Sequence, residues 1–182
     1  MATPLTKRIW MVLSSKLIQN SHISGERLRQ AMSHFATGVA VVTSRGASGQ
    51  PVGTTANAVT SLSLDPPLIL VCFAHASQTL AALRDHGAFA VNVLGAQHRD
   101  VSSAFARRGS DGAWDGIDHH AGHTASPRLS DALATLDCAV EETFPGGDHQ
   151  IVVGRVLEID VSERDREPLL YYRGDYASLG AG

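Results

Sequence analysis

GVAVVTSRGASGQPVGTTANAVTSLSLDPPLILVCF, residues 38–73, is the stretch that decides the fold class. Its first strand is β-branched and apolar over 39–43, and Gly and Ser in 45–50 predict a turn. A second strand is expected over 52–63, ended by Asp65-Pro66-Pro67, and a third over 68–73. The connections are too short for a parallel crossover, so the strands pair antiparallel and a doubly wound sheet is excluded.

The rest of the chain adds helices between further strands. Helices are expected over 24–38, begun by Ser24 and ended by Gly38, over 78–86, begun by Ser77, and over 96–108. Further strands are expected over 89–94, 136–144 and 150–161, the last two joined by a hairpin at 145–148. The sequence therefore predicts a mainly β protein, a small antiparallel barrel with helices inserted at its ends.

Length and charge restrict the class of function. The chain has 182 residues, 15 Lys and Arg and 18 Asp and Glu, so its formal net charge of −3 excludes a broad basic surface for nucleic acid. The sequence has no run of 18 apolar residues, so no membrane-spanning helix is predicted. Cys72 and Cys138 lie in separate apolar runs, as expected of reduced thiols in a cytoplasmic protein. We expect an N-terminal arm over 1–22 and one domain over 23–182.

A histidine cluster, His119, His120 and His123, lies in the polar stretch 109–128. Its spacing could hold a metal, but it lacks the glutamate of an H-E-x-x-H helix. We interpret it as a solvated loop and predict no metal site.

The segment Gly53–Ser63 is rich in small and hydroxyl-bearing residues. Its Thr, Asn and Ser side chains can donate and accept hydrogen bonds without charge, and its small residues let a flat ligand approach the backbone. The same composition also suits a barrel-lining strand whose hydroxyl groups bond to their neighbours. The residues alone leave both interpretations open.

Six motifs in order resemble the short-chain flavin reductases, the reductase components of two-component flavin monooxygenases. They are FATGVAVVTS (35–44), PVGTTANAVTSLSLDPPLILVCF (51–73), SQTLAAL (77–83), FAVNVL (89–94), GGDHQIVVGRV (146–156) and LLYYRGDYASL (169–179). The resemblance covers about residues 24–180 and leaves the arm outside. It implies an antiparallel, Greek-key-like split β-barrel that binds flavin and forms a homodimer.

The resemblance also implies two sets of site residues. The ring and ribityl chain of FAD or FMN would lie along the middle segment, with the phosphate near SQT. The expected flavin contacts are Thr37, Gly38, Thr55, Ala56, Asn57, Ala58, Ser61, Leu62, Ser63, Ser77, Thr79 and Phe105, with Arg107-Arg108 near an adenosine tail. The expected contacts of NADH or NADPH are His149 of the GDH hairpin and Arg173, Gly174, Asp175 and Tyr176.

The implied activity is an NAD(P)H:flavin oxidoreductase. Hydride passes from the nicotinamide to N5 of the flavin, and the reduced flavin leaves for a partner monooxygenase. Because the flavin carries the chemistry, no catalytic acid–base residue is expected. The alternatives are a flavin-binding split barrel without rapid NADH turnover and an enzyme like pyridoxamine-phosphate oxidase. The sequence does not decide FAD against FMN or NADH against NADPH.

Overall fold

The computed structural model describes residues 23–107 and 112–179, in two compact units, Met1–Phe35 and Ala36–Gly182. The predicted arm, 1–22, lies outside the described residues. In the first unit, helix α2 (Gly25–Met32) begins as predicted, because the Ser24 side chain accepts a hydrogen bond from the Arg27 N–H. It ends at Ser33 instead of Gly38, which is taken up by strand β1 (Thr37–Gly38).

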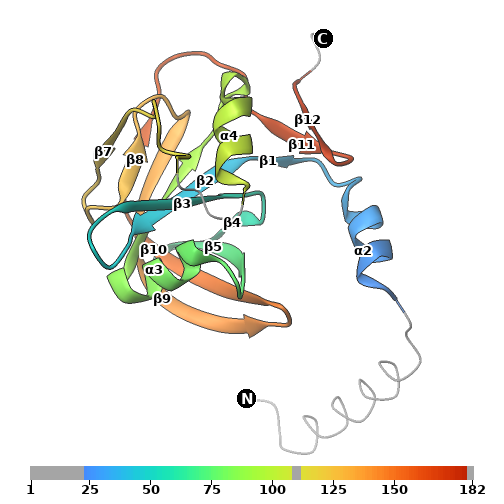
Figure 1. Ribbon diagram of the computed structural model, residues 1–182, viewed down its shortest axis with the longest axis horizontal. Coiled ribbons are helices and arrows are strands. Elements are labelled where there is room, and N and C mark those ends of the chain that lie inside the picture. The colour runs from blue at the N-terminus through green and yellow to red at the C-terminus, as the bar shows by residue number, and fades with distance from the viewer. Residues whose placement is uncertain (1–22, 108–111, 180–182) are drawn as a thin grey trace, which may run out of the picture. The chain divides into compact units, whose positions relative to one another are not determined.

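The second unit is built on a seven-stranded antiparallel sheet in the order β3-β2-β6-β9-β10-β5-β4. Figure 1 shows the sheet curling, with helix α3 (Gln78–His86) and helix α4 (Arg99–Phe105) beside it. The strands are β2 (Ala40–Arg45), β3 (Pro51–Ala56), β4 (Val59–Leu64), β5 (Pro67–Ala74), β6 (Ala88–Val93), β9 (Ala134–Gly146) and β10 (His149–Val161).

The single strand predicted over 52–63 is wrong. The chain forms β3, bends at Asn57-Ala58 and continues as β4, and these two strands are the opposite edges of the sheet. The Cys72 N–H on β5 donates to the Ala58 carbonyl, which ties the bend to the far side of the sheet. A sheet whose two edges are joined by a two-residue bend must curl on itself, and this makes the barrel.

The core of the barrel is formed by large side chains from the central strands and α3. Phe89, Val71 and Leu83 are fully buried there. Gly154 of β10 lies against the Phe89 ring, and a Cβ at this position would come within 2.4 Å of it. A side chain at Gly154 would therefore displace the ring.

The polar segment after α4 holds more regular structure than predicted. A short 3-10 turn (Ala96–His98) precedes α4, and strands β7 (His119–Ala121) and β8 (Pro127–Leu129) pair within the segment expected to be a loop. Three-residue strands fall below the length at which alternation of residue types becomes visible.

A second, three-stranded sheet lies next to the barrel. It has the order β1-β11-β12, with β11 (Leu170–Tyr172) and β12 (Asp175–Ala177). Arg173 and Gly174 join these strands with φ of 52° and 87°. Two successive positive φ values are typical of the tight turns that match the twist of a hairpin.

The two cysteines are free thiols, as predicted, with Cys138 buried and Cys72 half-buried. Burial raises the pKa of Cys138 to about 12, helped by the neighbouring Asp137 carboxylate. Among the described residues, no helix is both long and apolar enough to cross a bilayer. The cytoplasmic location stays a prediction.

Candidate active site

The first group of expected flavin contacts lies at the end of β3. The Thr55 hydroxyl donates to the Ser102 carbonyl on α4 at 2.6 Å, so this side chain already has a partner within the protein. Ala56 packs on the barrel core. Thr55 therefore fits the alternative of a barrel-lining strand whose hydroxyl groups bond to their neighbours. Its oxygen still has lone pairs that could accept a hydrogen bond from a ligand.

Asn57 and Ala58 differ from Thr55 because they are exposed at the bend between the two sheet edges. Within residues 23–107 and 112–179, no hydrogen-bond partner is found for the Asn57 amide. The alternative in which Asn57 is a buried residue of the barrel wall is therefore wrong. On β4, Ser61 and Leu62 are exposed and Ser63 is half-buried, so this edge strand is accessible to a ligand.

The SQT motif forms the start of α3. The Ser77 hydroxyl accepts from the Leu80 N–H at 3.3 Å, and its backbone is extended, which makes it the N-cap expected from the sequence. Thr79 is almost completely buried against the barrel. An anion at this helix start would therefore meet the Ser77 side chain and backbone N–H groups, with the Thr79 side chain turned inward.

Thr37 brings an unsatisfied group to the small sheet. Its Oγ1 is buried and has no hydrogen-bond partner among the described residues. Thr37 pairs with Tyr171 of β11, and Gly38 with Leu170, so the flavin residues predicted on β1 lie beside the predicted nicotinamide segment. A buried hydroxyl without a partner is costly in a folded protein, and a polar ligand atom would satisfy it. The neutral donors at Thr37 and Asn57 thus fit the polar edge of a flavin.

The GDH hairpin presents His149 at the start of β10. Its Nδ1 lies 2.7 Å from Oδ1 of Asp148, and hydrogen bonding to His149 lowers the pKa of the Asp148 carboxyl. Nearby, the ring of His75 bonds to the Gly147 carbonyl at 3.0 Å, and the backbone N–H of His75 donates to the backbone carbonyl of Asp148. His75 therefore ties the hairpin to the loop that leads into Ser77.

Helix α4 holds strand β12 through several side chains. The Tyr176 hydroxyl donates to the Ser102 hydroxyl at 2.8 Å. Arg99 bonds Asp175 at 2.7 Å, and its guanidinium lies 5.2 Å from the centre of the Tyr176 ring. Figure 1 shows α4 beside β1 and the β11–β12 pair. The Arg99 pair is exposed, so the Tyr176 contact is the better defined of the two.

Phe105 lies in the core, whereas it was expected to contact the flavin. Phe105 is 1% exposed and packs edge-on against Trp114, with ring centres 4.9 Å apart. It also fills the space beside Gly53, where a Cβ would lie 3.0 Å from the ring. Phe105 is therefore a core residue in this structure, and we leave it out of the proposed contacts. Arg107 is exposed, and Arg108 lies outside the described residues.

The histidine cluster does not gather into a metal site. All three histidines are exposed, and His119 contacts the Trp114 ring and bonds the Ile117 carbonyl. Among the described residues no group of His, Cys, Asp and Glu could hold a metal ion.

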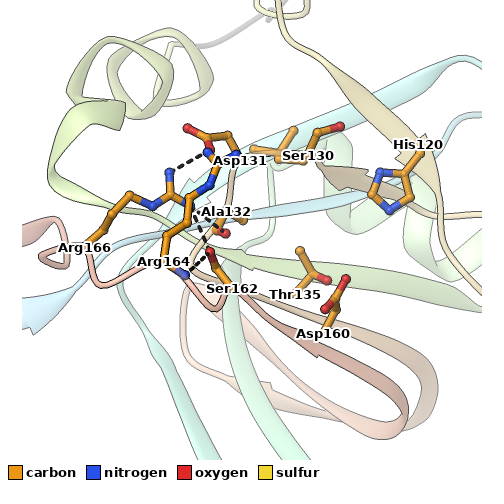
Figure 2. A pocket seen from close by; sticks show the side chains of 10 residues that line it. His120, Ser130, Asp131, Ala132, Thr135, Asp160, Ser162, Arg164 and Arg166 are labelled. Carbon is orange, nitrogen blue, oxygen red and sulfur yellow. Dashed lines mark hydrogen bonds and ion pairs between the residues drawn. The ribbon is translucent and has the colours of Figure 1, made fainter.

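A polar pocket of about 170 Å³ lies where β9 and β10 end away from the GDH hairpin, and Figure 2 shows its side chains. Asp131 accepts hydrogen bonds there from Arg166 at 2.7 Å and Arg164 at 3.2 Å. Its other oxygen faces His98 at 3.3 Å. Arg164 and Arg166 pair with Asp131, Asp160 pairs with the buried Arg128, and none of the predicted site residues lines this pocket. The pocket is therefore separate from the candidate active site.

The comparisons with known proteins agree with this geometry. Residues 32–180 match the family described as "Flavin reductase like domain". The chain belongs to the flavin reductase family. A "Probable flavin reductase" of Rhizobium meliloti (strain 1021) is 43% identical over 149 residues, which are 82% of this chain and 47% of that protein. The chain thus spans about half the length of this relative.

Two further relatives carry more specific names. The reductase component of a 4-nitrophenol 4-monooxygenase/4-nitrocatechol 2-monooxygenase of Rhodococcus opacus is 40% identical over 81% of this chain and 77% of its own. The NADH:FAD oxidoreductase of Streptomyces globisporus, solved with NAD and FAD fragments, has a TM-score of 0.78. It is 35% identical and covers 85% of this chain and 92% of its own. The predicted fold, a split β-barrel of flavin reductase type, is confirmed.

Sequence reasoning missed the residues that hold the site together. Ser102, Arg99 and His75 contact the predicted residues but lie in segments where the sequence offers only helical periodicity or a loop. The polar positions on the face of α4 could have drawn attention to Ser102. Nothing local to His75 indicates its contact with a hairpin more than 70 residues away.

Proposed function

We propose that this chain reduces free flavin with NADH and passes the reduced flavin to a monooxygenase. The observation that carries the proposal is the buried, unpartnered hydroxyl of Thr37 on the strand that pairs with the nicotinamide segment. It is supported by family membership and by relatives whose names include NADH, FAD, FMN and monooxygenase reductase component.

The proposed chemistry needs little from the protein beyond placement. The nicotinamide C4 loses a hydride and becomes oxidised, and the flavin N5 gains it, with one further proton from solvent completing the reduced ring. Holding two reactants about 3–3.5 Å apart replaces an encounter in solution by a reaction within one complex. This chain's side chains therefore bind and orient, and no acid–base residue is required.

The flavin contacts we propose come from four elements. Thr37 would donate to a polar atom of the ring, Asn57 would bond the ring edge from the exposed bend, and Thr55 would accept at the end of β3. Ser77 and the N–H groups of α3 would meet the phosphate. The remaining proposed contacts are Gly38, Ala56, Ala58, Ser61, Leu62 and Ser63.

The nicotinamide contacts we propose lie on two hairpins. A carboxylate can only accept, so the Asp148–His149 contact places a proton on His149 Nδ1. Nε2 is then the nitrogen available to the carboxamide. Arg173 and Tyr176 would flank the dinucleotide, and the other proposed contacts are Gly174 in the turn and Asp175 at the start of β12. These contacts do not decide whether the flavin is FAD or FMN.

We also propose a homodimer, in which a second copy covers apolar surface that one chain leaves exposed. Leu157, Ile159 and Val161 of β10 have exposed fractions of 47%, 57% and 64%. Ile159 and Val161, which follow the β-bulge at Leu157, share one face of the strand. Leu64 at the end of β4 is 91% exposed, and Leu28 of α2 is 57% exposed. Apolar side chains gathered on one strand face are unusual on a monomer. Sedimentation should give twice 19.3 kDa, and Ile159→Glu should shift the protein toward monomer.

The alternative of a pyridoxamine-phosphate oxidase activity gains no support. Such an enzyme needs several unpaired cations around two phosphates. Arg99, Arg128 and Arg166 are instead paired with Asp175, Glu158 and Asp131. Steady-state oxidation of NADH with FAD, FMN and riboflavin tests the proposal, because a flavin carrier without reductase activity would bind flavin yet leave NADH unchanged.

A further inference from the structure

Ser102 contacts both halves of the proposed site. It lies on α4 and is fully buried. Its backbone carbonyl accepts from the Thr55 hydroxyl on the flavin strand, at 2.6 Å. Its side-chain hydroxyl accepts from the Tyr176 hydroxyl on the nicotinamide segment, at 2.8 Å. One residue therefore bonds two segments that lie more than 100 positions apart in the chain.

The two contacts use different groups of Ser102, so each can be removed separately. The carbonyl also accepts the helical bond from the Ala106 N–H at 3.0 Å, which means that both of its lone pairs are occupied. The Thr55 hydroxyl is therefore bonded to a carbonyl that the hydrogen bonding of α4 already holds in place. The hydroxyl contact with Tyr176 can be deleted by removing one oxygen from either partner without disturbing the Thr55 bond.

The surroundings make this contact stronger than a surface hydrogen bond. Ser102 is fully buried and Tyr176 is half-buried. The Arg99 guanidinium lies 5.2 Å and the centre of the Tyr171 ring 5.8 Å from the centre of the Tyr176 ring. The weaker contact from Ser103 to the Tyr176 hydroxyl, at 3.5 Å, lies at the limit of hydrogen bonding. Ser102 is therefore the principal partner of the Tyr176 hydroxyl among the described residues.

We propose that Ser102 is a positioning residue, which holds the nicotinamide segment β12 in register with the flavin strand β3 through Tyr176. This rests on the proposed function, because it matters only if β3 and β12 carry the two reactants. Loss of the contact would leave both ligands able to bind but would let β12 shift relative to β3. A small error in the separation of donor and acceptor slows the transfer more than it weakens binding.

The test is a double-mutant cycle with Ser102→Ala and Tyr176→Phe. Each single variant should lower kcat for NADH oxidation roughly three- to tenfold, the effect of one ordinary hydrogen bond, with flavin Kd unchanged. The double variant should be no worse than either single variant, because the same contact is lost. With NADH deuterated at the transferred position, the isotope effect on kcat should rise in the variants.

The matched control is Ser44→Ala. Ser44 is equally buried, and its hydroxyl donates to the Ala88 carbonyl at 2.8 Å on the barrel, away from the proposed contacts. This variant should lower Tm while leaving kcat and KM at the wild-type values below the transition. If Ser44→Ala changes kcat as much as Ser102→Ala does, the effect is a general loss of stability and the proposal is wrong.

The other outcomes are equally decisive. Additive losses in the double variant would mean that the Tyr176 hydroxyl and Ser102 act independently of each other. Unchanged kcat in the single variants would mean that their contact does not position β12, and both outcomes overturn the proposal. Tyr176→Phe keeps the ring and can be judged alone by its kcat, isotope effect and flavin Kd if Ser102→Ala does not fold. Wild-type protein without flavin-dependent NADH oxidation would instead contradict the proposed function, before any variant is compared.

Discussion

Nδ1 of His149 lies 2.7 Å from the carboxylate of Asp148, its immediate neighbour in the hairpin. Because the carboxylate can only accept, this contact leaves Nε2 as the available ring nitrogen. Asp148 itself is nearly fully exposed, so its contribution is to orient the ring more than to stabilise the fold. The hairpin thus presents one defined imidazole nitrogen to whatever lies next to it.

His149→Ala should lower kcat/KM for NADH about three- to tenfold, because one hydrogen bond to the nicotinamide is lost. Flavin Kd should stay at the wild-type value, since His149 lies outside the proposed flavin contacts. Asp148→Asn should have a smaller effect in the same direction. Equal damage to flavin affinity and to NADH turnover would remove His149 from the nicotinamide site.

Thr37→Val should weaken flavin binding by about 1–3 kcal/mol, measured as Kd, because a ring atom would face a methyl group. The stability of the flavin-free protein should stay the same or rise, because the lost hydroxyl has no partner among the described residues. The control is Thr43→Val, whose buried hydroxyl bonds the Ala90 and Pro127 carbonyls and whose loss should lower stability. A drop in stability for Thr37→Val without a change in Kd would contradict the assignment.

Asn57→Ala should also weaken flavin binding by about 1–3 kcal/mol, while the Tm of the flavin-free protein barely changes. Its amide is exposed at the bend that joins the two edges of the sheet, so the fold does not depend on it. The Tm and the Kd are measured on the same sample. A large fall in Tm with unchanged Kd would show that Asn57 has a structural role.

The pH dependence of stability should carry a contribution from His98. Its Nδ1 accepts from the Gly95 N–H at 3.2 Å, so the ring must be neutral, with its proton on Nε2 facing Asp131. Burial lowers the pKa of His98 below its ordinary value of 6.5, and the Asp131 carboxylate only partly opposes this. The unfolded chain then takes up a proton first as the pH falls.

The contribution of neutral His98 to the free energy of unfolding is therefore complete above pH 6.5. It is lost as the pH falls through the folded-state pKa of His98. Urea unfolding at a series of pH values should show His98→Gln with a flatter decline than the wild type in this range. The exposed His123 serves as control, and His123→Gln should follow the wild type. If the stability of the wild type and of His98→Gln falls equally steeply with pH, the proposed neutral His98 between the Gly95 N–H and Asp131 is contradicted.

The sequence predicted the elements better than their arrangement. Continuous runs of β-branched and apolar residues located β2 and β5, the hairpin signal at 145–148 located the β9–β10 pair, and Ser24 and Ser77 marked two helix starts, because these signals are local. The bend at Asn57-Ala58 was missed because no Gly or Pro marks it and a single Asn is a weak turn signal. The bend follows from closure of the sheet, which is a tertiary constraint.

The site was predictable where a motif carries it and not where distant segments meet. Thr37 and His149 were predicted from the family resemblance, and the structure gives each an environment that suits a ligand contact. Phe105 was misplaced because an aromatic residue on a helix face is equally suited to the core, and the space beside Gly53 decides between them. Ser102 was not predicted, since its role depends on two contacts from far along the chain.

The most direct test of the proposed function is an anaerobic mixture of NADH, flavin and a catalytic amount of the chain. The account predicts that the absorbance of oxidised flavin disappears as NADH is consumed, one flavin for each NADH, many times faster than without the chain. It predicts further that the reduced flavin is released and exceeds the protein many times over. Binding of flavin to the folded protein with no acceleration of this exchange would contradict the account.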